Sequence, residues 1–224
     1  MIPLIKNTFY KEHETKQALA EFIIQTDILS MGSNCFEFEK QFSLKQGSAF
    51  GILFNSGGSA NLALLQALKN LGRLKSGDRI GFSALTWSTN VMPIIQLGMI
   101  PVPIDIDPQK INVTSSTLKE RLAETKINAF FGTNVLGFLG DLEEINNFCS
   151  KNNIIYLEDN CESLGSELAQ GKSGSFGCAA TFSFFVAHHL STIEGGMICT
   201  NDEELAEMLR IVRANGWDRN LHSL

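Results

Sequence analysis

Short apolar runs alternate with stretches of helical periodicity along most of the chain. Apolar runs bounded by Gly, Pro, Ser or Asn predict buried β-strands, whereas apolar residues at every third or fourth position predict amphipathic helices. The predicted strands span residues 49–54, 79–82, 100–106, 127–135 and 154–158, and the predicted helices span residues 59–71, 89–97, 116–124 and 142–152. This alternation indicates an α/β fold, a three-layer sandwich with a mostly parallel central sheet covered on both faces.

Both flanks of this region have a different pattern. Before it, residues 11–28 and 34–42 have the spacing of amphipathic helices. After Asp159, a loop rich in Gly and Ser precedes a predicted strand over residues 178–185, two adjacent histidines, and a second strand over residues 197–200. The sheet is therefore expected to gain two more strands near the end of the chain.

The last predicted helix is marked at both ends. Asn201 is expected to cap its N-terminus, with Glu204 three residues later as the partner in a capping box. Gly216 is expected to end the helix in a left-handed conformation.

Composition and charge exclude several classes of protein. The chain has 224 residues and a net charge of −6, and this acidic balance without a basic cluster argues against a nucleic-acid partner. Five cysteines at irregular spacing favour reduced thiols in the cytoplasm over disulfides or a zinc site. The N-terminus lacks the apolar core of a signal peptide, and the longest apolar region, residues 91–104, is too short for a membrane span. These features predict a soluble, cytoplasmic protein.

A phosphate site is one interpretation of the stretch Asn55-Ser56-Gly57-Gly58-Ser59-Ala60-Asn61. It lies between a predicted strand and a predicted helix, at the edge of a parallel sheet where ligands bind. Two glycines allow a tight turn, and the first turn of a helix offers free N–H groups and a positive dipole end. The alternative is an ordinary connection in which a serine caps the helix.

Acidic and aromatic residues occupy similar positions elsewhere. Asp159 follows the predicted strand 154–158, and Glu162 comes three residues later, so both carboxylates could point into a site. Such a pair suits acid–base catalysis or a metal, but an acidic solvated loop is the commoner case. Trp87 lies at another junction between strand and helix, where an indole either stacks on a planar ligand or packs in the core.

Two adjacent imidazoles, His188 and His189, follow an apolar, aromatic run. Each imidazole needs a partner or water, which loop carbonyls or a ligand could supply. Adjacent residues seldom coordinate one ion together and the other histidines are His13 and His222, so no metal is predicted. Together, the phosphate cup, Trp87, a carboxylate and an imidazole are the parts needed to hold a flat, phosphorylated heterocycle with a protonatable ring nitrogen.

These motifs, in this order, resemble the DegT/DnrJ/EryC1 family of sugar aminotransferases, which use pyridoxal phosphate on the fold-type-I aminotransferase scaffold. The resemblance runs through Asn55-Ser56-Gly57, Trp87, Glu158-Asp159 with Glu162, Gly174-Ser175-Phe176-Gly177, Phe182-Ser183-Phe184 and Glu194-Gly195-Gly196. It covers essentially the whole chain and implies the large, cofactor-binding domain of that fold.

The resemblance assigns one group of residues to the cofactor phosphate. Backbone amides of Gly57, Gly58 and Ser59 should cradle it, and the hydroxyl of Ser183 should donate to it. Gly58 departs from the hydroxyl residue common at this place in the family, so the cup would rely there on backbone donors.

A second group is assigned to the cofactor ring. Trp87 should stack on the pyridine ring, and the Asp159 carboxylate should pair with the ring nitrogen and keep it protonated, so that the ring acts as an electron sink. Glu162 occupies a place near the ring hydroxyl where the family usually has Gln.

The decisive departure from the family pattern is at His188. The aminotransferases carry a lysine here that forms a Schiff base with the cofactor, and imidazole cannot do so. The segment from His188 to Gly196 resembles a branch of the family, the nucleotide-activated 4-keto-6-deoxyhexose 3-dehydratases. These enzymes use pyridoxamine phosphate to remove the C3 hydroxyl on the route to the 3,6-dideoxysugars of lipopolysaccharide O-antigens. The resemblance implies that His188 acts as the acid–base catalyst, while His189 is expected to orient the turn.

Two subtypes of this branch differ in substrate. One acts on a GDP-sugar and regenerates the amine cofactor with glutamate, and the other acts on a CDP-sugar with a [2Fe–2S] cluster and a reductase. We favour the GDP type. A nucleotide-sugar aminotransferase and a truncated, inactive cofactor-binding domain are the alternatives.

The resemblance also implies a domain organisation. Residues 1–47 are predicted to form an N-terminal helical segment, residues 48–216 the cofactor-binding large domain, and residues 217–224 the start of a continuation. Family members continue into a smaller C-terminal domain, which this chain is expected to lack, and complete their active sites across a homodimer.

Overall fold

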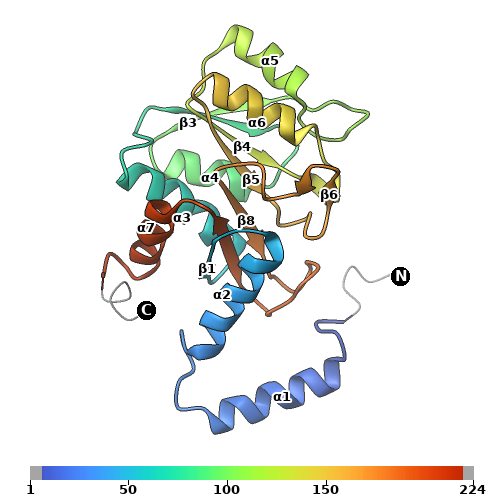
Figure 1. Cartoon of the computed structure of the whole chain (residues 1–224), viewed down its shortest axis with the longest axis vertical. Helices are drawn as coiled ribbons and strands as arrows, with labels where there is room; N and C mark the ends of the chain where they lie inside the picture. Colours follow the sequence, from blue (N-terminus) through green and yellow to red (C-terminus); the bar gives the residue numbers. More distant parts are fainter. Residues whose placement is uncertain (1–6, 219–224) are drawn as a thin grey trace.

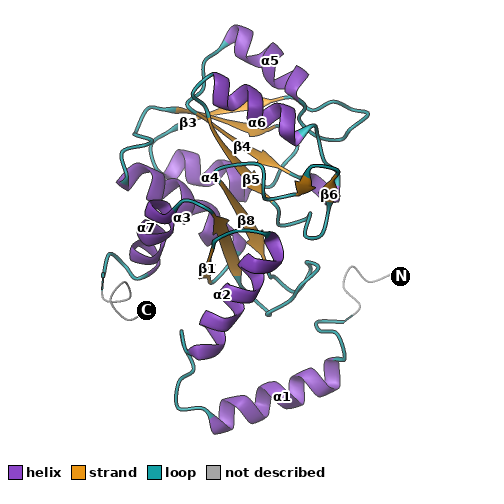
Figure 2. Cartoon of the chain, in the orientation of Figure 1, coloured by secondary structure: helices purple, strands orange, loops and turns teal. Residues whose placement is uncertain are grey.

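Helices and a central sheet make up most of the computed structural model, which describes residues 7–218 (Figures 1 and 2). The helices are α1 (Glu12–Gln25), α2 (Ser33–Gln46), α3 (Gly57–Asn70), α4 (Ser88–Gln96), α5 (Ser115–Glu124), α6 (Leu142–Lys151) and α7 (Glu203–Arg213), with the short 3-10 helix η1 (Val135–Gly137). The strands are β1 (Phe50–Phe54), β2 (Arg79–Ser83), β3 (Ile100–Ile104), β4 (Ala129–Thr133), β5 (Ile155–Asp159), β6 (Glu167–Leu168), β7 (Gly171–Lys172), β8 (Ala179–Ser183) and β9 (Gly196–Thr200).

Seven strands form the central sheet in the order β1-β9-β8-β5-β4-β2-β3. Strands β3, β2, β4, β5 and β8 run parallel to one another, whereas β9 is antiparallel to both β8 and β1. Because β9 is antiparallel to both of its neighbours, β1 runs in the same direction as β8 and β5. The predicted, mostly parallel sheet is confirmed, and the carboxyl ends of β1, β5 and β8 lie at the same edge.

Both faces of the sheet are covered by helices, as the α/β pattern predicts. Helices α3, α4 and α7 pack on one face over Ile52, Phe131 and Leu157. On the other face, α5 and α6 cover Phe130 and Tyr156, while α2 covers the β8–β9 end. Neighbouring residues Phe130 and Phe131 belong to opposite faces because side chains alternate along a strand. The result is the expected three-layer sandwich.

Aromatic rings fasten α2 to the sheet next to the predicted site. Phe42 of α2 meets Phe182 and Phe184 edge-on, with ring centroids 5.1 Å apart in each pair. Both partners are fully buried and flank Ser183 in the sequence. The end of β8 is therefore held on both sides of Ser183 by tight packing.

Helix α1 contrasts with the rest of the chain because it contributes no buried side chain. Figure 1 shows α1 apart from the sheet, and a short loop joins it to α2. The division at residues 47 and 216 stays a prediction, and residues 219–224 of the predicted continuation lie outside the described residues. Within residues 7–218, no helix combines the length and apolar character needed to cross a lipid bilayer.

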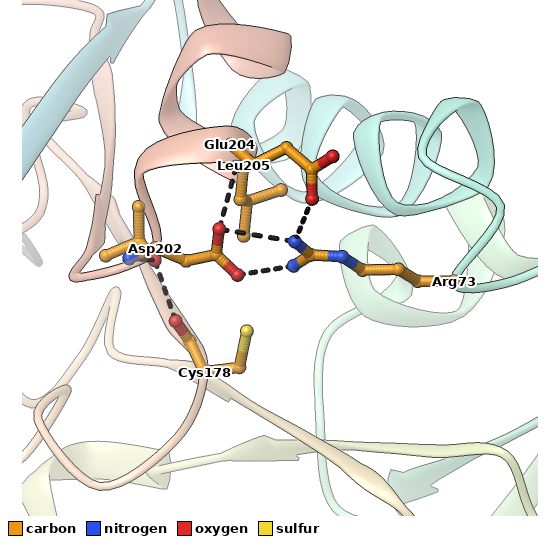
Figure 3. Close-up of polar contacts among 6 residues, drawn as sticks. Arg73, Cys178, Asp202, Glu204 and Leu205 are labelled. Atoms are coloured by element: carbon orange, nitrogen blue, oxygen red, sulfur yellow. Dashed lines mark hydrogen bonds and ion pairs between the residues drawn. The ribbon is translucent and has the colours of Figure 1, made fainter.

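The predicted N-terminal cap of the last helix is wrong by one residue. Asp202, not Asn201, precedes α7, and its carboxylate accepts a hydrogen bond from the backbone N–H of Leu205 at 3.0 Å. Asn201 instead accepts from the backbone N–H of Ala49, just before β1. With Asp202 as the cap, Glu204 is at the second helical position and not at the third, where a capping-box partner stands, and its carboxylate pairs with Arg73, as Figure 3 shows. Gly216 has a φ of +88°, which confirms the expected left-handed conformation after the helix.

Acid should weaken the attachment of α7 through Asp202. Arg73 holds the pKa of Asp202 below its usual value of 3.8, so the ion pair stabilises the fold above that pH and is lost as the pH falls below it. Asp202→Asn keeps a good cap but removes the charge, and should cost under about 1 kcal/mol at pH 7 because the pair is partly exposed. Urea unfolding of both proteins should show this difference shrinking between pH 6 and pH 3, and a constant difference would contradict the interpretation.

Candidate functional site

Three of the predicted motifs meet at one edge of the sheet. Strand β1 leads into the turn before α3, β5 ends at Asp159, and β8 ends at Ser183. Asp159 pairs with Thr181, and Ser183 pairs across β9 with the end of β1 through Gly196. Ligands of parallel α/β sheets bind at this carboxyl edge, so the topology supports one shared site.

The turn before α3 presents an anion-binding arrangement. The Ser56 hydroxyl caps the helix by accepting from the backbone N–H of Ser59 at 3.0 Å, and it donates to the Ser59 hydroxyl at 3.0 Å. The Ser59 amide is therefore used inside the turn. The amides of Gly57 and Gly58 lie in the first helical turn, where no acceptor of the helix reaches them, and they remain the better donors for a phosphate.

Close packing brings Gly57 against Ser183. A Cβ atom at Gly57 would lie 2.7 Å from Ser183 Cβ and 3.1 Å from Cys161 Sγ, so only glycine fits. A Cβ at Gly196 would lie 2.2 Å from the carbonyl oxygen of Ser56, which explains the glycine at the start of β9. The Ser183 hydroxyl thus lies beside the start of α3, as its predicted role requires.

Asp159 is nearly inaccessible and surrounded by donors. It is 3% exposed, and its Oδ2 accepts from Nδ2 of Asn61 at 3.1 Å and from Nδ2 of Asn90 at 2.8 Å. Its Oδ1 accepts from the backbone N–H of Cys161 at 2.9 Å. Our sequence analysis gave no role to the two asparagines. The available signal was an asparagine inside an otherwise apolar helical pattern, because asparagine is an unfavourable residue in helix interiors.

Glu162 and Trp87 form a contact that the sequence did not predict. The indole Nε1 of Trp87 donates to Glu162 Oε1 at 2.7 Å, and the backbone N–H of Leu136 donates to Oε2 at 2.8 Å. Trp87 is 64% exposed at the start of α4, so it is not a core residue. A carboxylate accepts both bonds, whereas a glutamine would have to present an N–H to one of these donors.

His188 lies in the loop after β8, because the strand ends at Ser183 and not at residue 185 as predicted. The His188 side chain is half-buried, and its ring meets that of Phe185 with centroids 6.3 Å apart. Burial lowers the pKa of His188 below 6.5, although the carboxylates of Glu162 and Asp159 raise it; His189 lowers it further. His188 therefore lies close enough to Glu162 and Asp159 for both charges to act on its pKa.

The titration of His188 should follow the sign of this shift. An ordinary histidine is half protonated at pH 6.5. Since burial lowers the pKa of His188, its imidazole is expected to be still mostly neutral at that pH. Histidine NMR signals followed from pH 8 to pH 4.5 would measure the midpoint, with the signal assigned by comparison with His188→Asn. A midpoint above 6.5 would contradict this prediction.

Glu158 shows how the Gly174-Ser175-Phe176-Gly177 turn supports the site. Its side chain is fully buried and accepts from the backbone N–H groups of Gly174, Phe176 and Gly177 and from Asn134 Nδ2, at 2.8–3.2 Å. Burial raises its pKa and these donors oppose the rise. The turn is thereby tied to β5 directly beside Asp159.

Other candidate locations lie elsewhere or lack the required groups. A hollow beyond the end of β3, lined by Asp105, Thr114, Glu120 and Arg121 among others, contains none of the predicted site residues. In the described part of the chain, no group of three or more His, Cys, Asp or Glu residues is arranged to hold a metal ion.

The fold agrees with that of known proteins. The DegT/DnrJ/EryC1/StrS aminotransferase family matches residues 10–223, and the chain belongs to this family.

The similar proteins include dehydratases of sugar biosynthesis. GDP-4-keto-6-deoxy-D-mannose 3-dehydratase of Escherichia coli O55:H7 is 38% identical over 201 residues, which cover 89% of this chain and 52% of the relative. A crystal structure of GDP-4-keto-6-deoxymannose-3-dehydratase, a His-to-Asn mutant with bound GDP-perosamine, matches with a TM-score of 0.89 and 36% identity over 99% of this chain and 57% of that one. Another, with a trapped PLP-glutamate geminal diamine, matches with the same values. The chain thus spans about half the length of the relatives that it matches.

Proposed function

We propose that this chain is the cofactor-binding part of a dehydratase that removes the C3 hydroxyl of a GDP-linked 4-keto-6-deoxyhexose. The observation that carries the proposal is His188, which the resemblance places where the family's aminotransferases have lysine and whose pKa the nearby carboxylates of Asp159 and Glu162 raise. Lys172, the nearest lysine in the preceding turn, donates to the backbone carbonyl of Lys45 on α2. An aminotransferase with a covalently bound cofactor is therefore the weaker alternative.

The residues at the strand edge fit pyridoxamine or pyridoxal phosphate. Amides of Gly57 and Gly58 and the Ser183 hydroxyl would hold the phosphate, and Asp159 would accept from the ring nitrogen. Gly57 and Asn61 lie on the same face of α3, about 6 Å apart along its axis. This spacing is compatible with a phosphate at the first turn and a ring nitrogen near Asn61 and Asp159.

When bound, the cofactor would supply an electron sink and, as pyridoxamine phosphate, an amine for the sugar ketone. The chain's own contribution to the reaction is to hold and move protons. A neutral ring nitrogen of His188 would accept a proton beside the cofactor, and the resulting imidazolium would donate it to the departing C3 hydroxyl. Trp87, oriented by Glu162, would cover the ring of the cofactor.

The expected partners follow from the same proposal. The substrate would be a GDP-sugar, glutamate would restore the amine form of the cofactor, and two copies of the complete protein would form a homodimer. Five cysteines without a disulfide suit a reducing cytoplasm.

The proposal is tested by incubating the chain with GDP-4-keto-6-deoxymannose, pyridoxal phosphate and glutamate. We expect a product that has lost the C3 oxygen, identified by mass spectrometry and by NMR of the C3 methylene group. A product that retains the C3 hydroxyl and gains an amine at C4 would establish the aminotransferase alternative. Bound cofactor without any product would establish a cofactor-binding domain that is not an enzyme by itself.

A further inference from the structure

Two buried asparagines face the Asp159 carboxylate from different helices. We propose that Asn61 and Asn90 are positioning residues that hold this carboxylate as a pure acceptor with one position left for a strong donor, and so select a ligand ring that carries an N–H. The inference rests on the proposed function, because it assumes that the ligand ring meets Asp159.

The contacts converge on a single oxygen atom. Asn61 of α3 and Asn90 of α4 are both 0% exposed, and the side chains of both donate to Oδ2 of Asp159. The backbone N–H of Cys161 donates to Oδ1. Helices α3 and α4 pack on the same face of the sheet, so the carboxylate is clamped from two rigid elements.

The orientation of both carboxamides follows from their other contacts. Nδ2 of Asn61 also donates to the backbone carbonyl of Thr89 at 3.2 Å, and a carbonyl only accepts. Oδ1 of Asn90 accepts from the Thr86 hydroxyl at 3.0 Å. Rotating either carboxamide would turn its oxygen toward the oxygen of Asp159. Both side chains therefore present an N–H to the carboxylate.

Counting acceptor positions shows what this arrangement selects. An ionised carboxylate has about four lone-pair positions, and three are already used by Asn61, Asn90 and the amide of Cys161. The remaining position is approached by the Cys161 thiol, a weak donor that a stronger one, such as the protonated nitrogen of a planar ring, would displace. A ring with C–H at the same place would leave this position unsatisfied in a buried site.

An unsatisfied polar atom of Asn61 supports a functional role for this residue. Oδ1 of Asn61 is buried and has no hydrogen-bond partner in the described part of the chain. Buried polar atoms are rarely left without a partner, and an unsatisfied one costs about 1–3 kcal/mol. An apolar residue would avoid this cost but could not donate to Asp159.

The test compares two ligands that differ at one atom. Dissociation constants are measured for pyridoxamine phosphate and for its 1-deaza analogue, in which C–H replaces the ring nitrogen, with the wild-type chain, Asn61→Leu and Asn90→Leu. Each substitution should weaken binding of pyridoxamine phosphate about tenfold, the value of one lost hydrogen bond to a charged group, and leave the analogue within about twofold. If a leucine variant does not fold, the same measurements are made on the alanine variant at that position, Asn61→Ala or Asn90→Ala.

Asn112→Leu is the matched control, since Asn112 is 4% exposed and donates to the backbone carbonyl of Phe138 and to Asn134 Oδ1, and neither bond reaches the Asp159 carboxylate. It should leave the ratio of the two dissociation constants unchanged. Equal losses for both ligands in the Asn61 and Asn90 variants, or no loss for either, would overturn the inference.

Failure of the proposed function would look different. If the wild-type chain binds neither ligand, the proposed function fails and the positioning role is decided by urea unfolding of the cofactor-free chain. Asn90→Leu and Asp159→Leu should then have non-additive effects on the unfolding midpoint, because the first removes a partner of the second. Additive effects would overturn the inference.

Discussion

Replacing His188 by Asn should reduce C3 dehydration about a hundred- to ten-thousandfold, the usual contribution of a positioned acid–base group. Asparagine is close to histidine in size and polarity but cannot exchange a proton near neutral pH. The fold and the cofactor affinity should be preserved, because the His188 side chain lies in a loop and not among the buried core residues. The initial rate of deoxygenated product formation measures the effect.

The adjacent histidine provides the matched control for this experiment. His189 is exposed and has no role in the proposed chemistry, so His189→Asn should keep a rate within a few-fold of the wild-type chain. An undiminished rate in His188→Asn would remove His188 from the mechanism. Equal losses in both variants would indicate that the loop, and not the His188 imidazole, is what matters.

Replacing Glu158 by Leu should produce the largest loss of stability at the site. Leucine would leave four donors unsatisfied, namely the amides of Gly174, Phe176 and Gly177 and the side chain of Asn134. Each buried donor without an acceptor costs about 1–3 kcal/mol, so the total approaches the whole stability of a typical domain. Urea or thermal unfolding measures the change.

A smaller substitution separates hydrogen bonding from packing. Glu158→Gln keeps the size and one acceptor oxygen, so it should lie between the wild-type chain and Glu158→Leu. Glu167→Gln, at an exposed position of β6, is the control and should change stability by less than about 0.5 kcal/mol. If Glu158→Leu unfolds at the same urea concentration as the control, Glu158 does not hold the turn.

Periodicity predicted the fold because the core follows it closely. Apolar residues alternate between the two faces of β4, and the interior positions of α3 are buried. Ends of elements were less predictable. Asn201 and Asp202 are both good caps, but Asn201 binds the amide of Ala49 and Asp202 pairs with Arg73, and both partners are distant in sequence.

The site was predictable where a local motif carries it and not where it depends on distant contacts. The glycines at the start of α3 and the carboxylate at the end of β5 stand at junctions that sequence order alone identifies. Asn61 and Asn90 become partners of Asp159 only when α3 and α4 pack side by side. The bond between Trp87 and Glu162 joins residues 75 positions apart, so no local pattern reveals it.

Borohydride reduction tests most directly whether this chain holds its cofactor without a covalent bond to lysine. The wild-type chain and His188→Lys are each loaded with equimolar pyridoxal phosphate, reduced, and analysed by intact mass and peptide mapping. We expect the His188→Lys chain to carry a pyridoxyl group at position 188 and the wild-type chain to carry none. A pyridoxyl group at one defined lysine of the wild-type chain would contradict the assignment of His188 and restore the aminotransferase interpretation.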